Sequence, residues 1–353
     1  MQKISYMANQ IISKKECMML KGLAILFIIM HNYCHEFSFA TEANEFVWIK
    51  SNITGFNEHL FRYDHNIIID FFSFWGHYGV AIFLFISGYG LVCKYESPNW
   101  IEIKKTVFIK DHFIKLFKLM IFGFIANMIV NKFSTGYFFH DSWTIIGQLT
   151  FLVNFIPNSF INPGPYWYLG MILQLYILYI LLLYKKQNSY VYTILVLCLL
   201  IQVLCNPNGY LLFWIKRNFI GNYLPFALGI IYARSCNKCQ DTKISICFTI
   251  LLPFFIYISS FIYILWIFIP ALIIPLSISL IRFISKFESL SCTLFHIGSI
   301  SATVYIMHPI IHWLLLPSKI DIDFIYYYLL LYLCLCILIG YAYKLFLKHS
   351  RLL

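Results

Sequence analysis

Long apolar stretches separated by short polar breaks run through nearly the whole chain. A helix needs about 20 apolar residues to cross a bilayer, whereas a strand of an outer-membrane barrel has about 10 residues of alternating polarity. The pattern therefore predicts an all-α integral membrane protein, built as a bundle of about ten transmembrane helices. We expect the crossings at residues 18–38, 67–92, 113–131, 165–184, 189–205, 219–233, 244–261, 263–281, 293–316 and 324–343.

Two further features concern the organisation of the chain. The stretch Trp143–Phe155 is apolar but too short to cross, so we expect it to lie at the interface or to re-enter the membrane. No signal-peptide cleavage site follows the first apolar segment, which we interpret as a retained helix. Because no internal repeat of the transporter kind is visible, we expect residues 1–353 to form a single membrane-embedded domain.

Composition supports the membrane assignment and excludes other classes of protein. The 353 residues are 61% hydrophobic and 12% charged, against about 25% charged residues in an average soluble domain. Because a soluble core could not bury so much apolar surface, a soluble enzyme, a disordered protein and a secreted disulfide scaffold are excluded. Cys236 and Cys239 form a lone C-x-x-C pair that cannot complete a tetrahedral site, so we expect no metal.

The net charge of +11 is explained by the positive residues on one side of a membrane protein and not by binding to a nucleic acid. With the N-terminus inside, 20 of the 26 Lys and Arg residues fall in inner segments and 6 in outer segments. Positive charges are enriched on the cytoplasmic side of membrane proteins. We therefore expect both termini to be cytoplasmic and membrane lipids to be the partners of the basic residues. The oligomeric state stays open.

The first predicted helix carries the polar residues that most resemble a reactive site. Lys21 lies near its inner end, and His31, Asn32 and His35 lie near its outer end. Interfacial anchoring is the simpler interpretation of such residues. Ionisable groups inside a span are nevertheless costly and often functional, and an H-N-x-x-H pattern behind an embedded lysine favours chemistry.

Other polar residues are candidates for the functional site because apolar helices rarely carry polar side chains. The small residues near Ser87 have a simpler explanation, because such residues let helices pack closely. The aromatic residues of the fourth helix could likewise form an interfacial belt. The basic segment after the second helix suits lipid phosphates or a phosphorylated cofactor. Pro309 should bend the ninth helix and leave a carbonyl unpaired. The candidates are Lys110, His112, Lys115 and Lys118 in the basic segment, and Glu36, Asp70, Ser87, Trp167, Gln174, Tyr305 and His308 elsewhere.

Five motifs resemble those of the acyltransferase-3 family, in that family's order, over residues 17–345. They are KGLAIL…H (Lys21–His31), GVAIFLFISGY (Gly79–Tyr89), YWYLGMILQLY (Tyr166–Tyr176), LPFALG (Leu224–Gly229) and ISATVYIMHP (Ile300–Pro309). The resemblance implies a ten-helix O-acyltransferase of the bacterial inner membrane. It further implies transfer from cytoplasmic acyl-CoA, usually acetyl-CoA, to a sugar hydroxyl of a surface glycan or its lipid-linked precursor.

Two positions depart from the family pattern. The family has ten residues between its first basic residue and the histidine, whereas nine lie between Lys21 and His31, so a gap-free match places Asn32, not His31, at that position. Where the family tends to have an R-x-x-R pair, this chain has His112-x-x-Lys115. Lysine does not provide the bidentate geometry of arginine.

Acyl transfer from a thioester needs a base for the acceptor hydroxyl and a stabilised oxyanion. We expect His31 to be the base, oriented by Asn32, His35, Glu36 or Asp70. Lys21 and the basic segment would bind the CoA phosphates, and Ser87, Gln174 or Tyr305 would stabilise the oxyanion. The alternatives are another membrane O-acyltransferase family and a glycan transporter or flippase, in which His31 and His308 form a relay.

Overall fold

The computed structural model describes residues 12–61, 66–96, 103–136, 142–156, 163–235, 242–315 and 322–352. Every regular element in these ranges is a helix, which confirms the all-α fold class. The helices are α2 (Lys14–Cys34), α3 (Lys50–Phe61), α4 (Ile67–Trp75), η1 (Gly76–Tyr78), α5 (Gly79–Tyr95), α6 (Lys105–Thr135), α7 (Ser142–Leu149), η2 (Val153–Phe155), η3 (Gly164–Tyr166), α8 (Trp167–Leu178), η4 (Tyr179–Leu183), α9 (Asn188–Leu204), α10 (Tyr210–Lys216), α11 (Phe219–Arg234), α12 (Thr242–Ser260), α13 (Tyr263–Ile284), α14 (Glu288–Ser299), α15 (Ser301–Leu314), η6 (Ile322–Phe324) and α16 (Ile325–His349).

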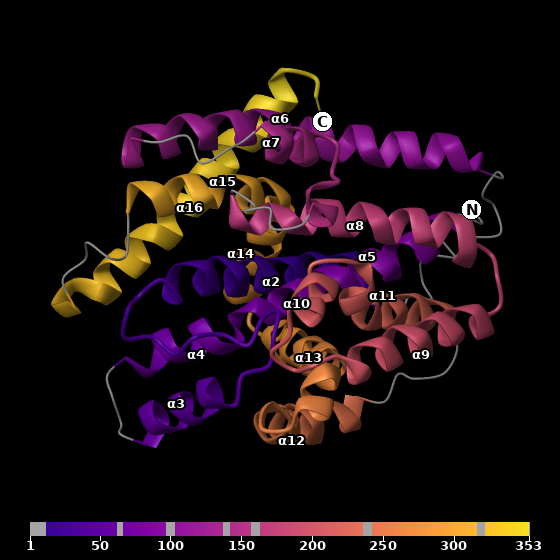
Figure 1. Ribbon diagram of the computed structural model, residues 1–353, viewed down its shortest axis with the longest axis horizontal. Coiled ribbons are helices and arrows are strands. Elements are labelled where there is room, and N and C mark those ends of the chain that lie inside the picture. Colours follow the sequence, from indigo (N-terminus) through magenta and orange to yellow (C-terminus); the bar gives the residue numbers. More distant parts are fainter. Residues whose placement is uncertain are drawn as a thin grey trace.

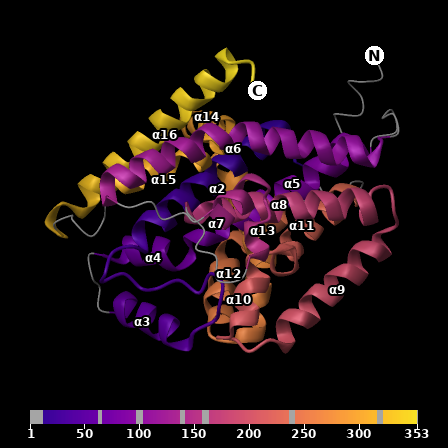
Figure 2. The same ribbon diagram turned by 45° about the horizontal axis from the view of Figure 1, so that its top comes forward.

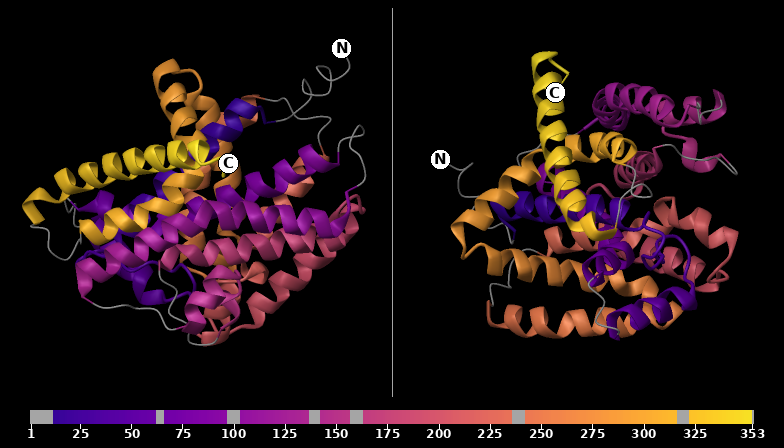
Figure 3. Two further views of the ribbon diagram at one scale, coloured as in Figure 1. Left: turned by 90° about the horizontal axis from the view of Figure 1, so that it is seen from above. Right: turned by 90° about the vertical axis from the view of Figure 1, so that its left-hand side faces the viewer.

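Helices α2 and α5 form the centre of the bundle. In Figure 1, α6 and α16 lie above them and α12 and α13 below. Figure 2 shows α9 at the edge of the bundle, where it packs on α11. Figure 3 shows α16 as a long helix along the outside of α15. Because α2 contacts α4, α5, α14 and α15, its side chains face several helices that could contribute to one site.

All ten predicted crossings coincide with helices, but they differ in length. Six helices are long and apolar enough to span a bilayer, and a seventh span results if α14 and α15 are counted together. The helices α9, α11 and the part of α12 whose side chains are described are shorter. The chain is therefore a multi-pass membrane protein, whereas ten crossings with both termini inside stay a prediction.

Two boundaries differ from the sequence prediction. Helix α6 begins at Lys105 rather than near residue 113, so the basic segment is helical and not a loop. The predicted crossing 293–316 is a pair of helices that meet at Ile300 with a bend of 77°. The short stretch Trp143–Phe155 lies within α7 and η2 and the turn between them.

Pro309 was expected to bend its helix, yet α15 continues through it. Its missing N–H would have bonded the carbonyl of Tyr305. Nδ1 of His308 lies 2.9 Å from that carbonyl oxygen and donates to it instead. The side chain before the proline thus satisfies the carbonyl that the proline leaves free.

Small residues allow α5 and α11 to cross closely. A Cβ atom on Gly88 would lie 2.3 Å from the carbonyl O of Phe226, and one on Gly229 would lie 2.1 Å from that of Phe85. Both approaches are shorter than any side chain tolerates, so glycine is required at both positions. This close contact fixes the position of α5, which also packs against α2.

A partly buried ion pair joins three elements at the other ends of these helices. Arg234 donates from Nη2 to Oε1 (2.6 Å) and from Nε to Oε2 (2.8 Å) of Glu96. The Tyr179 hydroxyl also donates to Glu96 (3.0 Å). Bidentate geometry of this kind gives strong and directional pairing. The predicted pair Cys236 and Cys239 follows this arginine but lies outside the described residues.

Candidate active site

His31 is a buried histidine near the end of α2, with 2% of its surface exposed. Its Nδ1 lies 3.0 Å from the carbonyl O of Ser73 and 3.2 Å from that of Phe72. A carbonyl oxygen only accepts hydrogen bonds, so Nδ1 carries the proton and donates it. In the neutral ring, Nε2 then keeps its lone pair. The backbone of α4 therefore fixes the tautomer in which Nε2 is the basic nitrogen.

Glu45 faces this basic nitrogen. Its Oε2 lies 3.4 Å from Nε2 of His31. Burial raises the pKa of the Glu45 carboxyl, but the hydrogen bond and charge of the protonated His31 ring, together with the charge of His77, outweigh it, so the pKa is lowered overall. An ionised carboxylate beside Nε2 stabilises the imidazolium that forms when His31 accepts a proton.

The loop of residues 35–49 joins α2 to α3 and carries this carboxylate. Asp70 is fully buried, and its Oδ1 accepts from the N–H (2.8 Å) and the hydroxyl (3.0 Å) of Thr41 in the loop. Its Oδ2 lies 2.9 Å from Nδ1 of His59 in α3. Ser73 donates to the Thr41 carbonyl (2.5 Å). Asp70 thus positions the loop instead of orienting the catalytic histidine candidate directly.

The second half of the same loop is fixed from the opposite side of the bundle. The N–H of Trp48 donates to the carbonyl of Pro207 (2.8 Å), and its indole donates to the carbonyl of Ser260 (2.9 Å). Asn44 and Ile49 exchange two hydrogen bonds that close the turn between them. With both halves anchored, the loop holds Glu45 in one place.

Three other groups surround the His31 ring. The ring of His35 stacks on it at 4.9 Å, while its own Nε2 lies 3.4 Å from Glu36. The ring of His77 meets it edge-on at 5.4 Å. A Cβ atom on Gly76 would lie 2.7 Å from Cβ of His31, so glycine permits this close approach. His35 and Glu36 therefore form a pair beside His31, and His35 contacts it through ring stacking and by donating from Nδ1 to the His31 carbonyl (2.9 Å).

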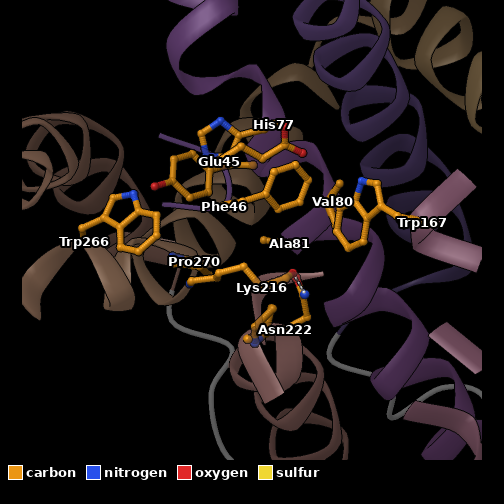
Figure 4. Close-up of a pocket in the computed structure, with 13 residues that line it drawn as sticks. Glu45, Phe46, His77, Val80, Ala81, Trp167, Lys216, Asn222, Trp266 and Pro270 are labelled. Carbon is orange, nitrogen blue, oxygen red and sulfur yellow. Dashed lines mark hydrogen bonds between the residues drawn. The ribbon is translucent and has the colours of Figure 1, made fainter. Parts of the chain in front are cut away.

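A pocket opens beside Glu45 and His77. Figure 4 shows Trp266 and Trp167 at opposite sides of it, with Lys216 and Asn222 across from His77. Its volume is about 50 Å³. Within the described ranges, no group of three or more His, Cys, Asp or Glu side chains could hold a metal ion. The lining residues are Glu45, Phe46, His77, Tyr78, Val80, Ala81, Trp167, Lys216, Gly221, Asn222, Pro225, Trp266 and Pro270.

Asn32 lies on a different side of α2 from this pocket. Its Nδ2 donates to the carbonyl of Ile28 (2.9 Å) and lies 3.4 Å from Nε2 of His308. Because His308 uses Nδ1 to donate to a carbonyl, its Nε2 is the acceptor of this contact. Asn32 therefore pairs with α15, whereas the neighbouring His31 faces Glu45.

A line of polar side chains continues from this contact through the bundle. Ser87 lies beside the hydroxyl groups of Tyr168 and Tyr176. The ring of Tyr168 lies 5.3 Å from that of Tyr305, and the ring of Tyr176 lies 4.8 Å from that of His112. From α2 to α6, the line runs through Asn32, His308, Tyr305, Tyr168, Ser87, Tyr176 and His112.

Two predicted oxyanion candidates have partners within the fold. Gln174 donates to Oδ1 of Asn218 (2.8 Å) and accepts from the N–H of Phe219 (3.1 Å). The Tyr305 hydroxyl donates to the carbonyl of Pro165. These bonds join α8 to α11 and α15 to η3. The Tyr305 hydroxyl is therefore not available to an oxyanion in this conformation, whereas the Gln174 amide keeps one of its two N–H donors.

The predicted donor-binding residues lie on two helices. Lys21 is half-buried on α2, among apolar neighbours. The basic residues of α6 lie in its first half, where Lys110 and Lys115 are exposed and Lys118 is half-buried. Nδ1 of His112 donates to the carbonyl of Phe108 within the same helix (2.8 Å). The exposed lysines form a surface that is available to a phosphorylated ligand.

Comparison with known families decides the class of the protein. The acyltransferase domain of the acyltransferase-3 family matches residues 19–344. The chain belongs to this family. It is therefore a multi-pass membrane acyltransferase, and the family implies an acyl donor. Neither the comparison with curated proteins nor that with solved structures found a match.

In this acyltransferase, two residues of the site were missed at the sequence level. Glu45 lies in the loop that follows the first helix, and Lys216 lies at the end of the seven-residue helix α10. Both stand outside the predicted crossings, where charged residues are common. Glu45 was one of several acidic residues near His31 in the sequence, and nothing in the spacing set it apart from Glu36 or Glu42.

Proposed function

We propose that the protein is an O-acyltransferase of a bacterial inner membrane, which transfers an acetyl group from cytoplasmic acetyl-CoA to a sugar hydroxyl. The acceptor is an extracytoplasmic polysaccharide or its lipid-linked precursor. The observation that carries the proposal is the pairing of His31 Nε2 with Glu45 at a pocket of a family acyltransferase. The imidazole has the tautomer that a general base needs.

The donor enters from the cytoplasmic side in this proposal. The exposed lysines of α6, together with Lys21, attract the phosphates of CoA. Lys21 precedes His31 by ten residues, which is about 15 Å along a helix. The thioester at the end of an extended CoA arm would cover such a distance. The line of polar side chains from His112 to Asn32 would give the thioester a route through the bundle that is less apolar than its surroundings.

The transfer itself follows from the two nitrogens of His31. The acceptor hydroxyl attacks the thioester carbonyl while Nε2 takes its proton. The proton donated from Nδ1 to the α4 carbonyls stays in place, and Glu45 stabilises the resulting imidazolium. When the tetrahedral oxyanion collapses, the C–S bond breaks and CoA leaves as a thiol with the proton from Nε2. The products are the sugar acetyl ester and CoA.

The test uses the full-length protein in liposomes. Acetyl-CoA is supplied on one face and a candidate glycan on the other, and release of the CoA thiol is measured with and without glycan. We expect glycan-dependent CoA release that is lost in His31→Gln and retained in Glu42→Gln. Movement of the glycan across the membrane without CoA release would overturn the proposal and favour a carrier.

A further inference from the structure

Lys216 is a buried ammonium group in the wall of the pocket. It ends α10 and is 8% exposed. Its Nζ lies 4.4 Å from the centre of the Trp266 ring. Within the described part of the chain, no carboxylate forms an ion pair with it. Burial lowers the pKa of Lys216 to about 7.

A buried ammonium without a counter-charge is costly for a fold. The contact with Trp266 offsets part of this cost, since a desolvated cation–π contact contributes about 2 kcal/mol. Glu45 lines the same pocket, but its carboxylate is paired with His31. Lys216 is therefore a cationic side chain in the pocket wall without a carboxylate partner among the described residues, and an anionic ligand bound beside it would stabilise its charged form.

The other walls of the pocket suit a saccharide. Trp167, Trp266 and Phe46 present aromatic surface, and ligand pockets typically combine such surface with a few polar groups. The volume of about 50 Å³ is more than one water molecule needs. It has room for a carboxylate or phosphate group, and the sugar that carries this group would reach it through the mouth.

We propose that this pocket binds the acceptor through an oxyanion that pairs with the Lys216 ammonium. The oxyanion is a carboxylate of an acidic saccharide or a phosphate of its lipid carrier. The inference rests on the proposed acyl transfer and adds the chemical class of the acceptor. Because Glu45 lines the pocket and contacts Nε2 of His31, a sugar held there would lie on the pocket side of the carboxylate that faces the base.

The test is protection of Lys216 from chemical labelling in the full-length protein in detergent. A small amine-reactive reagent is applied, and the labelled peptides are quantified by mass spectrometry. The probes are disaccharides that contain glucuronate or galacturonate, their neutral methyl esters, and a polyprenyl-phosphate sugar. Lys50, which is exposed on α3, is the internal control. At ten times its Kd, an acidic probe should slow labelling of Lys216 about tenfold and leave Lys50 unchanged.

The probes separate the two sources of the oxyanion. Protection by the uronates assigns the charge to the saccharide, and protection by the polyprenyl-phosphate sugar alone assigns it to the carrier. Lys216→Met keeps the apolar volume over Trp266 and should weaken binding of the effective probe about 10- to 100-fold. No protection by any acidic probe, or equal protection by the methyl esters, would overturn the inference. The CoA-release assay is independent, because acyl transfer without anion protection leaves the proposed function standing.

Discussion

His31 has one nitrogen committed to the fold and one available for chemistry. The carbonyls of Phe72 and Ser73 fix the proton on Nδ1, so the fold does the work that a buried aspartate does in a hydrolase triad. Glu45 contacts the opposite nitrogen. In this arrangement the Glu45 carboxylate stabilises the positive charge that forms when Nε2 accepts a proton. The backbone carbonyls, and not Glu45, fix the tautomer.

This division of roles predicts a moderate effect of Glu45→Gln. The substitution removes a charge-assisted hydrogen bond, which contributes about 1.5–3 kcal/mol. We therefore expect the transfer rate to fall about 10- to 100-fold, less than the loss from removing the base itself. The measurement is the rate of acetyl transfer at equal protein levels. Glu42→Gln, which changes an exposed acid of the same loop, should keep full activity, and an equal loss in both variants would contradict the role of Glu45.

At this scale, the sequence made His31 a candidate base but did not identify Glu45 as its neighbour. An ionisable imidazole inside an apolar helix is costly, which is why the sequence drew attention to His31. The sequence could not separate the partners, because Asn32, His35 and Glu36 are adjacent along the chain while Glu45 approaches through a folded loop. The choice between Asn32 and His31 also needed the neighbouring helices, which place the first against His308 and the second against Glu45.

Among the elements, the loop of residues 35–49 depends most on a single buried residue. Asp70 binds Thr41 of the loop and His59 of α3 through its two oxygens. Its contacts hold the loop that carries Glu45, without touching the His31 ring. A residue of α4 thus controls the site at a distance.

We accordingly expect Asp70→Asn to loosen the loop. The amide keeps the shape of the carboxylate but turns one of its two acceptors into a donor, which faces the donors of Thr41 or His59. Proteolysis within residues 39–49 should become faster, and acetyl transfer should decrease while acetyl-CoA binding stays unchanged. Glu58→Gln on the neighbouring α3 is the matched control. A loop that is as resistant as in the unchanged protein would contradict the positioning role.

Hydropathy predicted where the helices lie but not where they begin or break. The first turns of α6 are rich in lysine, so an apolar window starts eight residues too late. The bend between α14 and α15 lies at Ile300, directly after Gly298 and Ser299, a pair of the kind at which helices kink but which a hydropathy window does not detect. At Pro309, which the sequence marked as the bend, His308 satisfies the free carbonyl and the helix continues. Such compensation depends on one rotamer, which a sequence pattern does not contain.

In the whole molecule, the proposed transfer needs one face that binds the acyl donor and another that binds the acceptor. The basic residues of α6 and Lys21 would serve the cytoplasmic donor, whereas the pocket beside Glu45 would serve the external acceptor. The helices between them carry the polar line from His112 to Asn32. This division holds only if the positive charges mark the inner face.

Reporter fusions test that orientation. With both termini inside, fusions after Lys186 and after Arg234 should read cytoplasmic, and a fusion after Asn208 should read external. The prediction follows from the distribution of Lys and Arg residues among the connecting segments. A periplasmic signal after Lys186 would contradict the topology and exchange the donor and acceptor faces.

The most direct test of the account is the acetyl-transfer rate of two single variants, His31→Ala and His35→Ala, at equal levels of folded protein. Losing a general base typically costs about 10²–10⁴-fold in rate, so His31→Ala should lack detectable glycan acetylation. His35 stacks on the His31 ring and bonds the His31 carbonyl but does not contact Nε2, so His35→Ala should keep measurable activity. The reverse order would move the base to His35, and full activity in both variants would contradict the assignment of chemistry to α2.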